Sequence, residues 1–214
     1  MDNRIKSVVF NEEEHSYWYQ GKELRGVTGA IGKLMGKSFP DTDTVKLATM
    51  YGSDVHKDIE NYFNKNDYWF NDSELSTEGA KWIVDTLKDI CSFMVEKPES
   101  IECEVMVSDF VGTASKIDIV LRSTDNKVYL FDIKTTSTFD RPYCSLQLSL
   151  YKRLYEENYG GTVVAMYVLG TKAKRSFRII EQSSVKVDKI LAMNKTINQV
   201  KFVEDRIAGT KPLE

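Results

Sequence analysis

Apolar residues recur along this chain with two different periods, and each period predicts a different kind of element. Short aromatic and β-branched runs predict a hairpin over residues 7–25, turning at Gln20-Gly21, and a strand over 101–110. Apolar residues spaced three and four positions apart predict amphipathic helices. These helices cover residues 43–64, 76–96, 142–159 and 185–207.

Single residues add detail to the helices. A shorter helix is expected after the first hairpin, with Thr28 as its N-cap, and Ser76 is the expected N-cap of the second long helix. In the helix over 43–64, Leu47 and Met50 continue the apolar stripe.

Two apolar runs flank a short polar segment in the middle of the chain. Residues 116–122 and 127–134 predict two strands of a β-hairpin with a loop of four or five residues. If the loop is centred in the polar segment, Asp118 lies directly opposite Asp132, with Cβ atoms roughly 4.5–5.5 Å apart. Lys134 lies two residues beyond Asp132 and therefore points to the same face.

This pair of acidic residues needs a physical reason. The strands are otherwise rich in Ile, Val, Leu and Phe, and opposed like charges destabilise a sheet, the more so when they are desolvated. A divalent cation between Asp118 and Asp132 reverses the sign of that interaction, and Mg²⁺ is typically held by one or two carboxylates. The alternative is a solvent-facing pair that forms ordinary salt bridges with Lys134.

The remaining elements set the fold class. After the hairpin come a helix that ends at Gly160-Gly161, a continuous apolar run over 162–169 and a strand over 176–181. The apolar run predicts a strand buried on both faces, which is typical of a parallel pairing. Strands and helices thus alternate, and the sequence predicts a mixed α/β fold.

Composition places the chain among ordinary globular proteins. Its 214 residues are 42% apolar and 29% charged, and we expect one domain over residues 1–214. The net charge of −3 gives no global basic signature, so a nucleic-acid surface would have to be a local patch. Three cysteines without C-x-x-C spacing fit reduced thiols in a cytoplasm, and we expect neither a membrane span nor a secretory signal.

One histidine is a candidate metal ligand. His56 and Glu60 are four residues apart on a predicted helix and so share a face. Histidine is a common ligand, but pairs with this spacing also arise by chance on exposed helices. On the spacing alone, both interpretations stay open.

Basic residues gather between the last two predicted strands, in the segment Lys172-Ala173-Lys174-Arg175. This loop is either a solvated turn or a contact for a phosphate backbone. Lys33 and Lys37, close to glycines near the start of the chain, present the same two alternatives.

Taken in order, these motifs resemble the PD-(D/E)XK nuclease superfamily. The resemblance covers roughly residues 45–170 and joins an upstream G-x-x-x-H-x-x-x-E, an Asp across a hairpin from D-I-K, and a downstream Q-x-x-x-Y. It is closest to the RecB-type exonuclease branch and to the small nucleases of phages. It implies a restriction-endonuclease-like αβββαβ core at about 45–181, an N-terminal hairpin and lead-in at 1–42, and a C-terminal helix at 185–208.

The resemblance also implies a role for each residue that matches a family motif. Asp118 and Asp132 would coordinate the metal by carboxylate, and Ile133 would offer its backbone carbonyl. His56 would cap the metal site from its helix. Lys134 would be the catalytic lysine.

Further positions carry supporting roles in the same comparison. Gln147 and Tyr151 match a helix motif that supports the site and touches DNA, and Glu104 and Glu60 match two further acidic positions. The implied cofactor is one or two Mg²⁺ or Mn²⁺ ions. An iron–sulfur cluster is excluded, because the four cysteines that bind it in some relatives are absent. Ser115 stands where the family often has Gly, so the loop geometry there is expected to differ.

The activity implied by the resemblance is a metal-dependent DNA exonuclease with little sequence specificity. It would process double-stranded ends in phage recombination or replication, together with a single-strand annealing protein, and some relatives form homo-oligomeric rings. Two alternatives stay open: an endonuclease of the same fold, and a catalytically silent DNA-binding module. The sequence leaves the polarity of digestion and the strand preference undetermined.

Overall fold

A computed structural model describes residues 1–36, 43–65, 70, 75–94 and 98–207, so Lys37 lies outside the described residues. The helices are α1 (Val27–Leu34), α2 (Asp43–Lys65), α3 (Glu78–Phe93), α4 (Arg141–Tyr159) and α5 (Ser184–Ile207), preceded by the 3-10 helix η1 (Asn3–Ser7). The strands are β1 (Val8–Asn11), β2 (Ser16–Tyr19), β3 (Lys22–Gly26), β4 (Pro98–Ser108), β5 (Thr113–Ser123), β6 (Lys127–Lys134), β7 (Thr162–Gly170) and β8 (Arg175–Arg178). The predicted mixed α/β fold is confirmed.

All eight strands belong to one mixed sheet. Its order is β1-β2-β3-β5-β6-β7-β8, and β4 pairs with β5 in addition. β6 and β7 are parallel, as the apolar run of β7 predicts, and the other neighbours are antiparallel except β3 and β5. The parallel β6–β7 pair brings the ends of these two strands to the same edge of the sheet.

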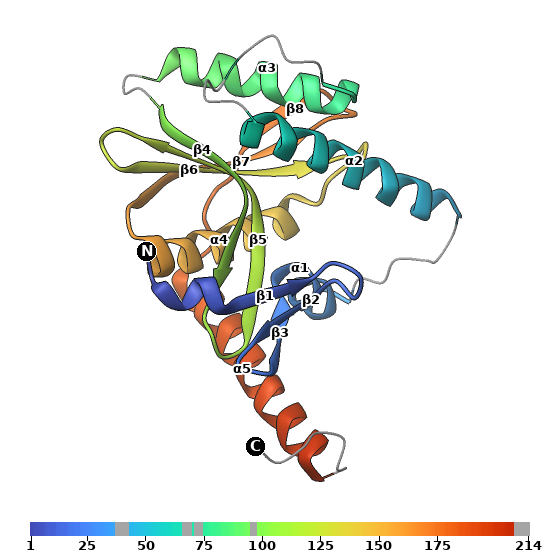
Figure 1. Cartoon of the computed structure of the whole chain (residues 1–214), viewed down its shortest axis with the longest axis vertical. Coiled ribbons are helices and arrows are strands. Elements are labelled where there is room, and N and C mark those ends of the chain that lie inside the picture. Colours follow the sequence, from blue (N-terminus) through green and yellow to red (C-terminus); the bar gives the residue numbers. More distant parts are fainter. Residues whose placement is uncertain (37–42, 66–69, 71–74, 95–97, 208–214) are drawn as a thin grey trace.

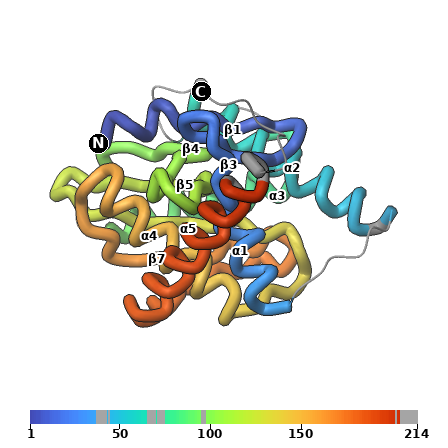
Figure 2. The backbone as a smooth tube through the Cα atoms, turned by 90° about the horizontal axis from the view of Figure 1, so that it is seen from below, coloured from blue at the N-terminus to red at the C-terminus, as the bar shows by residue number. Residues whose placement is uncertain are grey.

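Helices cover both faces of this sheet (Figure 1). One apolar core lies between the sheet and α4, and it includes Val120, Leu130 and Leu150. A second core lies under α2 and α3 and includes Ile119 and Phe131. These two residues are the chain neighbours of Val120 and Leu130, and they point to the opposite face of the sheet. Figure 2 shows α1, α4 and α5 close together on the side away from α2 and α3.

The long strand β5 organises the region between the two cores. It pairs with β3 at Thr113 and Ala114, and with β6 only from Ile119 onward. Between these two ladders, residues 115–117 pair with β4 alone, and Asp118 falls where the pairing with β4 is interrupted.

Several local predictions need correction. Gly26, not Thr28, is the N-cap of α1. The helix begins at Val27, two residues before the start that a Thr28 cap would give. Thr77, not Ser76, caps α3: its hydroxyl accepts a hydrogen bond from the Ala80 N–H. The first hairpin is a three-stranded meander, since β1 also pairs with β2.

The apolar stripe of α2 is buried over only part of the helix. Leu47 and Met50 are 67% and 63% exposed, whereas Val55 and Ile59 are buried against α3 and the sheet. The predicted helix is present, and its apolar stripe is exposed over the first two turns.

Candidate metal and nuclease site

The register of the sheet aligns acidic residues on three adjacent strands. Ile119 pairs with Phe131, which is the register predicted for the central hairpin and puts Asp118 and Asp132 in opposed positions. On the other side, Cys103 pairs with Ile119. One step along, Glu104 is level with Asp118. By extension of these two registers, Glu104, Asp118 and Asp132 are level with one another along β4, β5 and β6.

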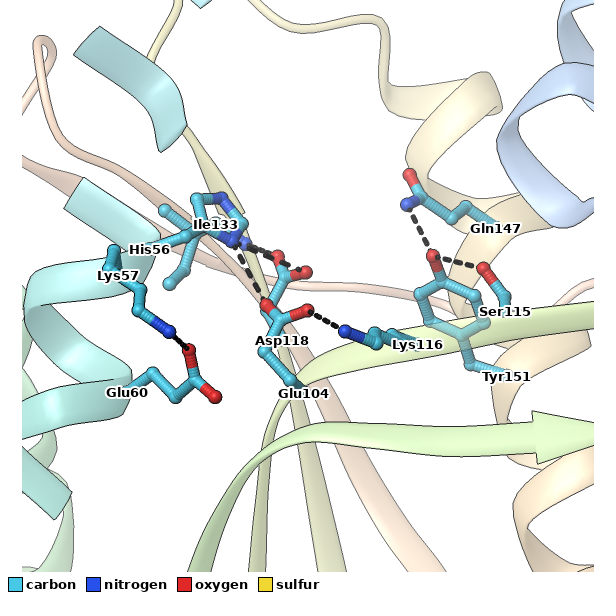
Figure 3. A network of polar contacts seen from close by, with 10 residues as sticks. All are labelled: His56, Lys57, Glu60, Glu104, Ser115, Lys116, Asp118, Ile133, Gln147 and Tyr151. Atoms are coloured by element: carbon cyan, nitrogen blue, oxygen red, sulfur yellow. Dashed lines mark hydrogen bonds and ion pairs between the residues drawn. The ribbon is translucent and has the colours of Figure 1, made fainter. Parts of the chain in front are cut away.

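Two of these carboxylates meet the imidazole of His56 (Figure 3). The Nδ1 atom of His56 is 3.4 Å from Glu104 Oε1 and 3.7 Å from Asp118 Oδ1. One ligand atom from each of the three residues lies within 4.8 Å of the others. Glu104 reaches this position from a backbone with φ of +53°, a left-handed conformation that few non-glycine residues adopt in a strand. Such strain is found most often at functional sites.

The third carboxylate has a different partner. Asp132 is 1% exposed, and its Oδ2 atom lies 2.7 Å from the ammonium of Lys134. Asp132 does not belong to the group formed by His56, Glu104 and Asp118. Ile133, between these two residues, donates its backbone N–H to Asp118 Oδ2 at 2.6 Å and thus fixes that carboxylate across the gap in the sheet.

A buried chain of hydrogen bonds continues from Lys134 into α4. The ammonium donates to Gln147 Oε1 at 3.1 Å, and Gln147 Nε2 donates to the Tyr151 hydroxyl at 3.0 Å. Ser115 donates to the same hydroxyl at 3.3 Å from β5. The predicted pair Gln147 and Tyr151 therefore connects Lys134 to the strand that carries Asp118. Ser115, the departure from the family pattern, completes this connection.

Charge and burial shift the pKa values of the central groups. Burial lowers the pKa of His56, but the charge of Asp118 and the hydrogen bond and charge of Glu104 outweigh it and raise that pKa to about 9. Burial raises the pKa of Asp118, the charge of His56 lowers it, and the charges of Asp132 and Glu104 raise it further, to about 7 as the net result. Burial lowers the pKa of Lys134, but the charges of Asp132 and Asp118 raise it above its ordinary value.

This donor set fits a divalent cation. Two carboxylates and one imidazole nitrogen converge, and the raised pKa of Asp118 shows that its negative charge is insufficiently compensated by the protein alone. Carboxylate ligands suit Mg²⁺ and Mn²⁺, and the imidazole shifts the balance toward Mn²⁺. His56, Glu104 and Asp118 are thus the residues best placed to hold an ion, with Asp132 beside them.

Two contacts on either side of His56 join α2 to its neighbours, one at the end of β6 and one at the start of α3. Gly52, one turn before His56, approaches the end of β6 so closely that a Cβ there would lie 3.1 Å from Thr135 Oγ1. Asp58, two residues after His56, accepts hydrogen bonds from the N–H and the hydroxyl of Thr77 at the start of α3. The spacing of the G-x-x-x-H motif therefore has a packing reason.

Other predicted residues lie apart from the three-residue group. Glu60 is paired with Lys57 at 2.9 Å on α2, outside the group around His56 (Figure 3). Lys172, Lys174 and Arg175 are exposed in the turn after β7. Since Gly170 of β7 pairs with Lys134, this basic turn lies at the same end of the sheet as the site.

Sequence reasoning missed one charged neighbour of the site. Lys116 lies 3.8 Å from Glu104 Oε2, and its ammonium is 4.3 Å from the centre of the Phe10 ring. Its position two residues before Asp118 is a signal that could have identified it, because alternate residues of a strand share a face. Phe10 belongs to β1, and the hairpin predicted over residues 7–25 did not distinguish this strand from β2.

A mixed sheet that brings carboxylates, an imidazole and a lysine together defines the chemistry of a metal-dependent hydrolase. The family model described as the PD-(D/E)XK nuclease superfamily matches residues 30–211, and the chain belongs to this superfamily. This membership implies a metal-dependent nuclease with DNA as its substrate.

The individual comparisons are more distant. A crystal structure described as "Putative exonuclease" from Eubacterium rectale shares 15% sequence identity with this chain, with a TM-score of 0.37. The alignment covers 90% of this chain and 79% of that one. No curated protein matches the sequence. None of the helices in the described ranges combines the length and apolar character needed to cross a bilayer.

Proposed function

We propose that the protein is a Mg²⁺- or Mn²⁺-dependent DNA exonuclease that hydrolyses phosphodiester bonds with little sequence specificity. The observation that carries this proposal is the convergence of His56, Glu104 and Asp118 beside the Asp132–Lys134 pair. Family membership supplies the reaction class, and the geometry supplies the residues that we assign to it.

The acidic residues and the histidine are the proposed ligands. His56, Asp118 and Glu104 would hold the ion, and Asp132 and the Ile133 carbonyl would complete the set that the family pattern implies. When bound, the ion would lower the pKa of a coordinated water and neutralise negative charge on the scissile phosphate. The protein positions these ligands in advance, because Asp118 is already held by the Ile133 N–H.

Lys134 has a charge-stabilising role in this proposal. The carboxylates of Asp132 and Asp118 raise its pKa, so the side chain is an ammonium at neutral pH and is poorly suited to abstract a proton. It can instead orient the attacking water and balance charge on the phosphate. Gln147 fixes the ammonium by accepting its hydrogen bond, and Tyr151 fixes Gln147.

The DNA backbone would lie against the basic turn. Lys172, Lys174 and Arg175 are exposed near the edge that carries Lys134. Contacts with phosphates carry no sequence information, which suits an enzyme that degrades from an end. The resemblance to phage nucleases leads us to propose double-stranded ends as the entry point, and a single-strand annealing protein as the partner that receives the product strand.

Digestion of matched linear and circular duplexes tests this proposal. With Mg²⁺ or Mn²⁺, linear DNA labelled at one end should lose its label progressively, whereas covalently closed circles should stay intact. Chelator should stop the digestion of the linear DNA. Cleavage of the circles would instead identify the endonuclease of the same fold, and failure to cleave any DNA with either metal would identify a silent module.

A further inference from the structure

An aromatic and cationic cluster lies beside the site without belonging to it. The rings of Phe139 and Phe177 have their centres 5.1 Å apart at an angle of 74°. The guanidinium carbon of Arg141 lies 4.7 Å from the centre of the Phe177 ring. Both rings are half-buried, and Arg141 is exposed. The cluster joins the linker between β6 and α4 to β8.

This cluster is fixed close to Lys134 by the sheet. Phe139 covers Gly170 so tightly that a Cβ on this glycine would lie 2.6 Å from the ring. Gly170 in turn is the β7 partner of Lys134 and the β7 partner of Arg175. The cluster is therefore one strand away from Lys134, and it adjoins the basic turn.

In the part of the chain that the structure describes, no carboxylate forms an ion pair with Arg141, Lys172, Lys174 or Arg175. Arg153, also on α4, is by contrast paired with Glu157 and with Asp188. Arg141 instead stacks on an aromatic ring, in a chain whose net charge is −3.

Stacked arginine and aromatic groups select for unpaired nucleotides. The faces of bases in a duplex are covered by their neighbours, so a protein group can stack only on a base that has left the duplex. Contacts with a duplex backbone need positive charge but no aromatic ring. A planar guanidinium on a phenylalanine offers both charge and a stacking face.

We propose that Phe177, Arg141 and Phe139 form a platform for unpaired nucleotides of the strand that is cut beside Lys134. The inference rests on the proposed function and specifies its substrate: the strand leaves the duplex before it reaches the metal ligands. The protein should therefore bind single-stranded DNA, or a duplex with an overhang, more tightly than a blunt duplex.

Binding without cleavage tests the platform. The full chain in chelator is titrated against a labelled single-stranded oligonucleotide and a blunt duplex of the same sequence, with fluorescence anisotropy as the readout. Arg141→Lys keeps the charge but removes the planar stacking group, and Phe177→Leu removes the ring. Each should weaken single-strand binding about tenfold, the effect of one lost base stack, and change duplex binding less than about twofold.

Matched controls and the cleavage reaction separate the possible failures. Arg153→Lys makes the same change elsewhere on α4, and Phe93→Leu changes a ring that is 87% exposed at the end of α3; neither should alter binding. An equal loss for both DNA forms, or no loss for either, would overturn the platform. If the variants behave as expected but the unmodified protein cleaves no DNA with metal, the nuclease assignment fails and the platform stands.

Discussion

The balance of charge at single residues determines what the site can do. Asp132 is almost fully buried, so the positive charge of Lys134 at 2.7 Å is needed both for the fold and for the proposed chemistry. A buried charge left without its partner typically costs about 3–5 kcal/mol. Stability and cleavage must therefore be measured separately for every variant of Lys134.

Two substitutions of Lys134 make this separation. Lys134→Arg keeps a cation beside Asp132 and should keep the melting temperature within a few degrees, while cleavage falls at least about 100-fold because the ammonium geometry is lost. Lys134→Ala should lose both. Metal binding by Lys134→Arg, measured by calorimetry with Mn²⁺, should stay near the unmodified value. Near-normal turnover in either variant would remove Lys134 from the mechanism.

Removal of the negative charge of Asp118 should raise the thermal stability of the protein and abolish its cleavage activity. In Asp118→Asn, the amide oxygen can still accept the hydrogen bond from the Ile133 N–H, and the unfavourable buried charge is gone. We expect a melting temperature in chelator higher by a few degrees at pH 8, together with loss of cleavage.

Asp109 is the matched control for this substitution. Its carboxylate accepts three backbone N–H groups in the turn before β5, so Asp109→Asn should lower the melting temperature. Loss of stability in Asp118→Asn would show that Asp118 is a structural ion-pair partner and not a repelled ligand.

The stability of the metal-free protein should fall as pH rises. The pKa of Asp118 is raised to about 7 and that of His56 to about 9, so the folded state binds more protons than the unfolded state between about pH 4 and 9. The stabilising contribution of His56 is complete below its unfolded pKa and is lost through pH 9; the penalty from Asp118 develops between about pH 4 and 7.

Melting temperatures in chelator from pH 5 to 9 check this sign. The unmodified protein should lose stability over this range, Asp118→Asn should lose less between pH 5 and 7, and Mn²⁺ should flatten the profile. A stability that rises with pH in chelator would contradict the charge balance described for the site.

At the scale of elements, the site depends on how closely α2 approaches its neighbours. At Gly79 of α3, a Cβ would lie 2.8 Å from the Tyr51 hydroxyl and 2.9 Å from a methyl group of Val55, next to His56. The contact that packs α3 on α2 therefore also fixes the imidazole. A methyl group at this position should move α2 and the ligand that it carries.

Two helical glycines give a matched test of this packing. Gly79→Ala should lower the melting temperature by several degrees and weaken Mn²⁺ binding, because α2 must shift. Gly29→Ala on α1, where no atom lies within 4 Å of the added Cβ, should raise stability by up to about 1 kcal/mol and leave metal binding unchanged. Equal effects of the two variants would show that α3 does not position α2.

The elements also show which features the sequence alone could predict. The hairpin register was predictable, because a short polar loop between two apolar runs allows only one pairing that keeps the apolar faces buried. The position of Glu104 was not, since its strand is irregular and φ at this residue is positive. The exposure of Leu47 was not predictable either, because periodicity identifies an apolar stripe but not how far a neighbouring element covers it.

At the scale of the whole molecule, charge is distributed unevenly. The chain carries a net charge of −3, yet Lys172, Lys174 and Arg175 lie exposed near the end of β6, and none of the carboxylates in the described ranges pairs with them. Local density of charge, not net charge, determines where a polyanion binds. This distribution predicts a salt-sensitive contact with DNA at one edge of the sheet.

Charge reversal of this turn tests the contact. The triple variant Lys172→Glu, Lys174→Glu and Arg175→Glu should weaken DNA binding at least about tenfold in chelator and reduce the slope of log affinity against log salt. Reversal of Lys22 and Lys189, which lie in β3 and α5, serves as a control of similar kind and should have little effect. Unchanged affinity at every salt concentration would exclude the turn from the DNA path.

We propose that one divalent cation binds between α2 and the strands β4 and β5. Anomalous diffraction from crystals of the protein grown with Mn²⁺ tests for this ion. We predict a peak within coordination distance of His56, Glu104 and Asp118 that disappears in crystals of Asp118→Asn. A peak that contacts none of these three residues, or no peak at saturating Mn²⁺, would contradict the account.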